Sequence, residues 1–112
     1  MLETSTVVLP DFAAGAVNLA SARLGAVGVF STDEFFAPVS RMLNDEPATF
    51  DPDLYDDNGK YMDGWESRRK RVPGHDYAVI RLAMPGRIFG FDVDTRFFTG
   101  NSGRKLAVSP AP

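Results

Sequence analysis

The sequence predicts a mainly β fold with one short helix near the N-terminus, and two segments in its second half carry the β prediction. YAVIRLAM, residues 77–84, is rich in strand-forming residues and lies between the turn signals PGHD and PGR. IFGFDVDTRFF, residues 88–98, alternates between apolar and polar side chains, as a half-buried strand does. We therefore expect two antiparallel strands joined by a type II turn at Pro85 and Gly86.

The alternation of residues 88–98 also sorts their side chains onto two faces. One face would hold Phe89, Phe91, Val93, Thr95 and Phe97, and the other Gly90, Asp92, Asp94 and Arg96. The carboxylates of Asp92 and Asp94 would then lie on the same side, about 7 Å apart. They form either the solvent-facing side of an ordinary strand or part of a polar site.

The N-terminal segment carries the clearest helical pattern. Asp11 can cap a helix that Gly25 is placed to end, and the apolar residues between them recur at spacings of four, three and four: Ala13, Val17, Ala20 and Leu24. AVGVF, residues 26–30, resembles a short strand. STDE, residues 31–34, has the spacing of a capping box, although Pro38 would limit any helix there to about one turn. Residues 44–60 read as a long irregular loop.

Length and composition indicate a single globular domain, or part of one. The chain has 112 residues, and 44% of them are hydrophobic. It contains no cysteine, which excludes disulfides and thiolate metal sites. The most apolar stretch, residues 12–30, includes Asn18, Ser21 and Arg23 and is not a membrane span. No basic residue precedes Arg23, which argues against a secretory signal, so we expect a cytoplasmic protein.

Charge is distributed unevenly along the chain. Eight acids and one base, Arg41, lie between Asp33 and Asp57, whereas residues 68–71 are all cationic. The net charge of −3 opposes nucleic-acid binding, which needs a basic surface overall. A short run rich in arginine can instead bind a small anion, because the guanidinium group matches a carboxylate in a bidentate manner.

The stretch MDGWESRRKRVPGHD, residues 62–76, is the main candidate site. If the part between its two turn signals is extended, Trp65, Ser67, Arg69 and Arg71 share one face, while Glu66, Arg68 and Lys70 share the other. His75 is followed by Asp76, and a carboxylate near an imidazole can fix its tautomer and tune it as a general base. The alternative is a solvated basic loop with a structural histidine.

A metal site is a weaker possibility. Glu66, His75, Asp92 and Asp94 are residue types that bind divalent ions such as manganese, magnesium or zinc. The sequence has none of the usual ligand spacings, such as HxH or HExxH. We therefore expect no metal and no other cofactor.

Four motifs occur in an order that resembles the N-terminal part of the first repeat of the allantoicase (allantoate amidinohydrolase) family. They are VNLASARLG, STDEFFAP, DGWESRRKR followed by PGHD, and FDVDTRFFTGN, and the resemblance covers roughly residues 12–101. It implies a β-sandwich of jelly-roll, galactose-binding-like topology that occurs twice in the full enzyme. That enzyme hydrolyses allantoate to ureidoglycolate and urea.

The resemblance also implies an incomplete domain, because chains of the family are several hundred residues long. We expect residues 1–112 to form one partial sandwich with an atypical tail at residues 102–112. Missing strands would expose a sheet edge, which favours a homo-oligomer. Two non-enzymatic interpretations stay open. The chain could be a ligand-binding or subunit module, or an anion-binding remnant that no longer turns over substrate.

The reaction assigns roles to the charged residues. Arg68, Arg69 and Arg71 are candidates for binding the carboxylate of allantoate. Glu66, His75 and Asp76 are candidates for activating water and for protonating the departing urea nitrogen. Asn101, with Thr99 and the backbone near Gly100, is a candidate for hydrogen bonding to the urea amides.

Overall fold

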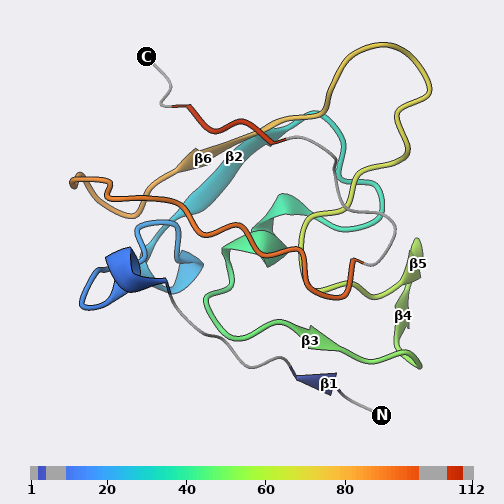
Figure 1. Ribbon diagram of the computed structural model, residues 1–112. Helices are drawn as coiled ribbons and strands as arrows, with labels where there is room; N and C mark the ends of the chain where they lie inside the picture. The colour runs from blue at the N-terminus through green and yellow to red at the C-terminus, as the bar shows by residue number, and fades with distance from the viewer. Residues whose placement is uncertain (1–2, 5–9, 99–105, 110–112) are drawn as a thin grey trace.

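The computed structural model describes residues 3–4, 10–98 and 106–109, and this part of the chain is β-rich with short 3-10 helices (Figure 1). Its strands form three antiparallel pairs. β1 (Glu3–Thr4) pairs with β3 (Thr49–Phe50), β2 (Val27–Ser31) pairs with β6 (Ala78–Arg81), and β4 (Tyr55–Asp56) pairs with β5 (Gly59–Lys60). Within these residues, no helix has the length and apolar character needed to cross a membrane.

The pairing of β2 with β6 is the longest of the three. Val27 lies opposite Arg81 and Ser31 opposite Ala78, with a register shift between Gly28 and Phe30. The two strands predicted at residues 26–30 and within residues 77–84 are therefore confirmed, although the second is shorter than expected. Both contain β-branched side chains, which suit a pleated surface.

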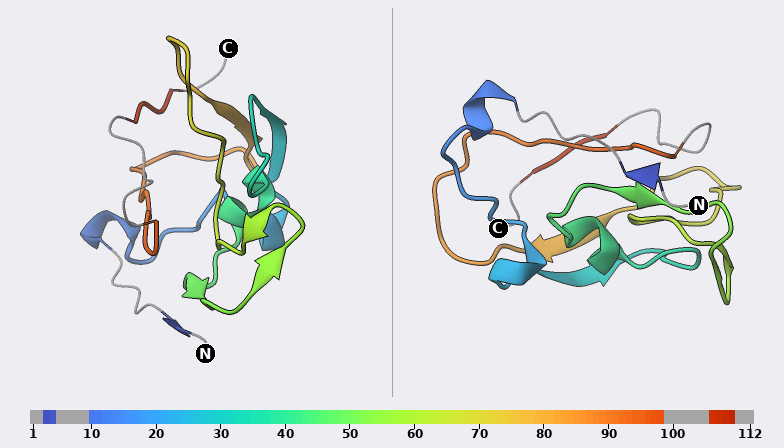
Figure 2. Two further views of the ribbon diagram at one scale, coloured as in Figure 1. Left: turned by 90° about the vertical axis from the view of Figure 1, so that its right-hand side faces the viewer. Right: turned by 90° about the horizontal axis from the view of Figure 1, so that it is seen from below.

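The predicted hairpin between residues 77–84 and 88–98 is wrong. β6 bonds to β2, and residues 88–98 contain no strand and cross the molecule as an irregular segment (Figure 2). After β6 the Ala83 amide donates a hydrogen bond to the Leu19 carbonyl at 2.9 Å. Phe97 stacks on Phe50, with ring centres 5.6 Å apart, but Phe89 is 68% exposed and Phe91 57% exposed, so most of the apolar face of the alternation is not packed.

The predicted helix over residues 11–25 is also wrong. Two 3-10 turns stand in its place, η1 (Asp11–Ala13) and η2 (Ala22–Leu24), and neither has a buried residue. Gly15 adopts a left-handed φ of 74° between them, which interrupts any helix. The apolar stripe therefore lacks the packing that stabilises most helices. Gly25 does end η2, with a φ of 113°, as predicted.

The small core lies around a third helix, η3 (Val39–Leu43), beside β2. Its buried apolar residues are Ala26, Ala37, Val39, Leu43 and Met62. The helix predicted from the capping-box spacing at residues 31–34 is absent. Glu34 instead accepts a hydrogen bond from the Val39 amide at 2.9 Å, so it satisfies the start of η3.

The segment 44–60, predicted as irregular, contains β3 and the short β4–β5 hairpin. Arg41 attaches this hairpin to η3. Its Nη2 lies 3.1 Å from the carboxylate of Asp56, its Nη1 donates to the Met62 carbonyl at 3.3 Å, and its guanidinium carbon lies 4.2 Å from the ring centre of Tyr61. These contacts order a loop that is mostly polar in sequence.

We predict that Gly28→Ala destabilises the fold, because a Cβ at Gly28 would overlap Cγ1 of Val39, whose side chain is buried. Overpacking of this kind costs about 1 to 3 kcal/mol. Urea denaturation measures the loss. Val29→Ala is the control in the same strand, because Val29 is 53% exposed, and it should change the unfolding free energy by less than about 0.5 kcal/mol. Equal effects of the two variants would contradict this view of the core.

Candidate functional site

Residues 66–77, here called the basic loop, project from the body of the molecule between the core and β6 (Figure 1). The loop begins at Glu66, whose backbone forms an isolated antiparallel bridge with Ala37. Two hydrogen bonds of 3.1 Å close this bridge. The loop ends at Tyr77, directly before β6. Both ends are therefore held by backbone pairing, and the cations lie between them.

Asp33 holds the first limb of the basic loop. Its Oδ2 accepts a hydrogen bond from Arg68 Nε at 2.8 Å, and its Oδ1 accepts the Arg68 amide at 3.4 Å. Its backbone carbonyl accepts the indole N–H of Trp65 at 2.8 Å. The Arg68 guanidinium carbon also lies 5.3 Å from the ring centre of Phe35. One residue thus contacts both Trp65 and Arg68.

Thr32 holds the second limb. Its amide donates to the Tyr77 carbonyl at 3.0 Å, and its Oγ1 accepts the Tyr77 amide at 3.0 Å. The same hydroxyl donates to Asp76 Oδ1 at 2.8 Å. Lys70 Nζ lies 3.7 Å from that carboxylate oxygen, so Asp76 also links the middle of the loop to its end.

The cations of the loop alternate in their environment. Arg68 and Lys70 form ion pairs with Asp33 and Asp76. Arg69 and Arg71 are exposed and form no ion pair with any residue that the structure describes. This is the alternation expected of an extended segment. It leaves Arg69 and Arg71 available to a ligand.

The predicted acid and base residues occupy different settings. His75 is exposed near the end of the basic loop, with its ring centre 6.1 Å from that of Tyr77. Asp76 is engaged by Thr32 and Lys70, and Glu66 is partly exposed at the base of the loop. Asn101, Thr99 and Gly100 lie outside the described residues.

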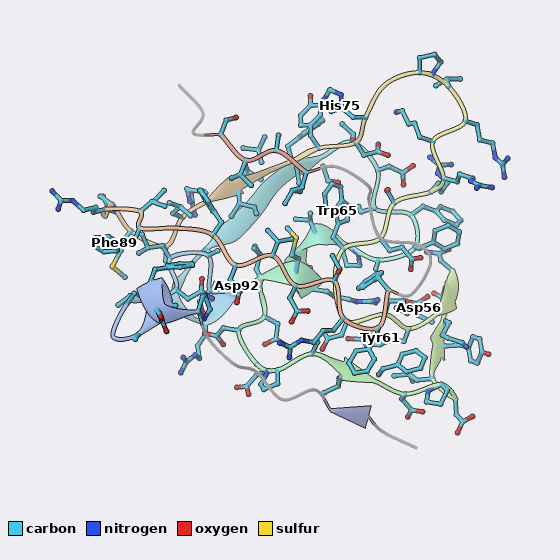
Figure 3. The ribbon with its side chains drawn as sticks, in the orientation of Figure 1. Asp56, Tyr61, Trp65, His75, Phe89 and Asp92 are labelled. Atoms are coloured by element: carbon cyan, nitrogen blue, oxygen red, sulfur yellow. The ribbon has the colours of Figure 1, made fainter. Side chains whose placement is uncertain are left out.

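The four residues considered as metal ligands are not brought together. Among the described residues, no three histidine, aspartate or glutamate side chains are grouped so that they could hold a metal ion. Asp92 lies in another part of the molecule from His75 (Figure 3). Asp94 accepts a hydrogen bond from the Arg96 amide at 2.9 Å and lies 3.5 Å from Arg96 Nε. Asp92 and Asp94 do not lie on a strand, which corrects the expected geometry of this pair.

The arrangement keeps Asp33 ionised. The hydrogen bond from the Phe35 amide and then that from the Arg68 side chain lower the pKa of Asp33 below its usual value. A similar arrangement occurs in the β4–β5 hairpin, where hydrogen bonds from the Asn58 amide and then from the Arg41 side chain lower the pKa of Asp56. In both places an aspartate is fixed by a nearby backbone amide and in turn fixes an arginine.

Comparison with known proteins identifies the family of the chain. The model of the allantoicase repeat matches residues 17–111. The chain belongs to the allantoicase repeat family. A probable allantoicase of Rhizobium meliloti (strain 1021) is 70% identical over 94 residues, which are 84% of this chain and 28% of the relative. No solved structure matches the chain.

Other relatives in the allantoicase family show the same coverage. Probable allantoicase 2 of Burkholderia mallei (strain ATCC 23344) and the probable allantoicase of Ralstonia nicotianae (strain ATCC BAA-1114 / GMI1000) are each 60% identical over 92 residues. These residues are 82% of this chain and 27% of each relative. The chain thus spans little more than a quarter of the curated relatives it matches.

Sequence reasoning missed the two residues that fix the loop of this allantoicase repeat. Thr32 and Asp33 belong to the STDE stretch, whose spacing indicated a helix start. Thr32 contacts Tyr77, which lies 45 positions further along the chain, and Asp33 contacts Arg68, which lies 35 positions further along. The one available signal was an acidic residue in a motif upstream of the cationic run, and it does not specify a partner.

We predict that Thr32→Val loosens the second limb of the basic loop. The valine keeps the shape and the backbone bond to Tyr77 but removes the hydroxyl that bonds Tyr77 and Asp76. Loss of about 1 kcal/mol should speed hydrogen exchange of the Tyr77 amide roughly fivefold. Thr95→Val is the control, because Thr95 is exposed and remote in sequence. An unchanged exchange rate at Tyr77 would show that the hydroxyl does not hold the limb.

We predict that the contribution of Asp33 to stability depends on pH in the acid range. Its pKa is lower in the folded chain than in the unfolded chain, so its stabilising effect is present above the unfolded pKa of about 3.9 and is lost as pH falls through the folded value. Asp33→Asn should therefore be less stable than the wild type at pH 7, and the difference should shrink below about pH 4. Thermal unfolding across this range measures it, and a difference that stays constant down to pH 2 would refute the prediction.

Proposed function

We propose that the chain carries substrate-binding and acid–base residues of an allantoicase, which converts allantoate and water to ureidoglycolate and urea. The observation that supports this most is the basic loop. In a chain of the allantoicase repeat family, Arg69, Arg71 and His75 are exposed on one loop, whose two ends are held by Thr32 and Asp33. Because both ends of the basic loop are fixed, the two arginines and the imidazole stay on the same part of the surface.

The chemistry needs three roles. Allantoate is a carboxylate whose neighbouring carbon bears two ureido groups. A water oxygen bonds to that carbon, the bond from the carbon to one ureido nitrogen breaks, and that nitrogen takes a proton to leave as urea. Arg68, Arg69 and Arg71 suit the carboxylate, because arginine pairs with carboxylates in a bidentate manner.

His75 and Glu66 suit the proton transfers. His75 is exposed, and a neutral imidazole is a common general base in enzymes, so it can take a proton from water. Glu66 or Asp76 would supply or hold the second proton. Asn101 remains the candidate for binding the urea amides.

The finer fold is part of the same proposal. We propose a partial jelly-roll sandwich of the galactose-binding type over residues 1–112, with residues 102–112 as its atypical tail. The exposure of Phe89, Phe91 and Val93 supports a second layer that packs on this segment, as a sandwich requires. A homo-oligomer would cover the same surface. A cytoplasmic location remains a prediction from the sequence.

We predict that the purified chain binds allantoate and releases urea from it. Calorimetry measures binding, and a urea assay measures turnover, with the probable allantoicase of Rhizobium meliloti as the comparison enzyme. Binding without urea release would support the alternative of a non-catalytic binding module. The absence of both would overturn the proposed function.

We predict separate effects of Arg71→Ala and His75→Ala. Arg71→Ala removes a charge-assisted contact to the carboxylate, which is worth about 1.5 to 3 kcal/mol. It should therefore raise KM about ten- to 150-fold. Loss of a general base should lower kcat about a hundred- to ten-thousandfold and change KM less. Arg87→Ala is the matched control, because Arg87 is an exposed arginine outside the basic loop. Near wild-type activity of both loop variants would make the charged motif architectural.

A further inference from the structure

We infer that Asp33 is a positioning residue that aims Arg68 at the substrate carboxylate. This inference rests on the proposed function and deepens it. It assigns a role to a residue outside the basic loop, 35 positions before the arginine that it contacts. It also states which edge of the Arg68 guanidinium group receives the ligand.

The contacts of Arg68 restrict its orientation. Nε donates to Asp33 Oδ2 at 2.8 Å, and the guanidinium carbon lies 5.3 Å from the ring centre of Phe35. A guanidinium group is planar and presents its N–H donors in a fixed fork. One bond at Nε and one aromatic ring at its side therefore limit both the direction and the rotation of that plane.

The outer edge of the fork stays available. The Arg68 side chain is 63% exposed, and neither terminal nitrogen forms a hydrogen bond with any described residue. Since Nε is occupied, the edge formed by Nη1 and Nη2 is the one that can hold two oxygens of a carboxylate. Arg68 therefore differs from Arg69 and Arg71, which have no comparable support among the described residues.

Asp33 is itself held firmly enough to orient another side chain. Its side chain is only 13% exposed. Its Oδ1 accepts the Phe35 amide at 2.9 Å, and its carbonyl accepts Trp65 Nε1 at 2.8 Å. A preorganised arginine loses less conformational freedom when it binds, so the support should appear as affinity for the carboxylate.

A purely electrostatic role gives the opposite sign. Asp33 is an anion beside the group that would bind an anionic substrate. If it acted only through its charge, its removal would raise the local positive potential and lower KM for allantoate. If it positions Arg68, its removal frees the guanidinium group and raises KM.

The test compares Asp33→Asn with Asp56→Asn. Asp56 is the matched control, because its carboxylate also accepts a backbone amide two residues on, at 2.9 Å, and pairs with an arginine, at 3.1 Å, but in the β4–β5 hairpin. Asp33→Asn should raise KM for allantoate about two- to twelvefold and leave kcat within about twofold. Asp56→Asn should leave both constants unchanged. A fall in KM in Asp33→Asn, or an equal rise in the control, overturns the inference.

A double-mutant cycle separates positioning from general damage. In the Arg68→Ala background, Asp33→Asn should have no further effect on KM, because the group that it positions is gone. Additive effects overturn the inference. Phe35→Leu is a second variant, for use if Asp33→Asn does not fold. It removes the ring beside Arg68 and keeps the backbone donor to Asp33, so it should also raise KM for allantoate.

The two proposals fail in different ways. A wild-type chain that neither binds nor hydrolyses allantoate refutes the proposed function. A wild-type chain that hydrolyses allantoate, with KM unaffected by Asp33→Asn, refutes the positioning role alone. If the chain binds allantoate but does not hydrolyse it, the double-mutant cycle is measured with dissociation constants from calorimetry in place of KM.

Discussion

The attachment of the basic loop to Thr32 and Asp33 is the constraint on which the candidate site depends. These two neighbours directly follow β2, and each binds one limb of the loop. The pairing of β2 with β6 brings Ser31 opposite Ala78, so it also brings Thr32 to Tyr77. The pairing of β2 with β6 therefore places Thr32 and Asp33 next to the basic loop, and their side chains then bond to it. Four consecutive cations repel one another, and two of them are paired with acids through this arrangement.

The acidic half of the chain has a corresponding structural role. Asp33, Asp45 and Asp56 each pair with an arginine from a distant position: Arg68, Arg23 and Arg41. Asp45 also accepts the hydroxyl of Ser21, which is fully buried. These aspartate–arginine pairs, here called polar clamps, join irregular segments of the chain and add to the stability of the small apolar core. Surface ion pairs contribute little alone, but in these clamps the aspartate is also fixed by a backbone amide or a buried hydroxyl, which lowers the cost of ordering the pair.

The sequence predicted the parts of the fold that local chemistry determines. The strands at residues 27–31 and 78–81 and the glycine at the end of η2 were identified because β-branched runs and left-handed glycines act locally. The helix over residues 11–25 and the strand over residues 88–98 were wrong because periodicity stabilises an element only where a partner surface exists, and Val17, Phe89 and Phe91 are exposed. The cationic motif was visible in the sequence. The residues that hold it, Thr32 and Asp33, were not, since no local pattern indicates a contact across 35 or 45 residues.

The site and the sandwich depend on different parts of the molecule. Residues 32–37 form the hydrogen bonds that hold both limbs of the basic loop to the body, and these residues are held in turn by β2, β6 and the core around η3. The exposed apolar side chains of Phe89, Phe91 and Val93 contribute to none of those bonds. A layer that packs on residues 88–98 would therefore add stability and complete the fold without having to create the geometry of the loop. Since binding groups that are held by their own scaffold do not need to be ordered by the ligand, the loop can retain its carboxylate-binding edge whatever covers that surface.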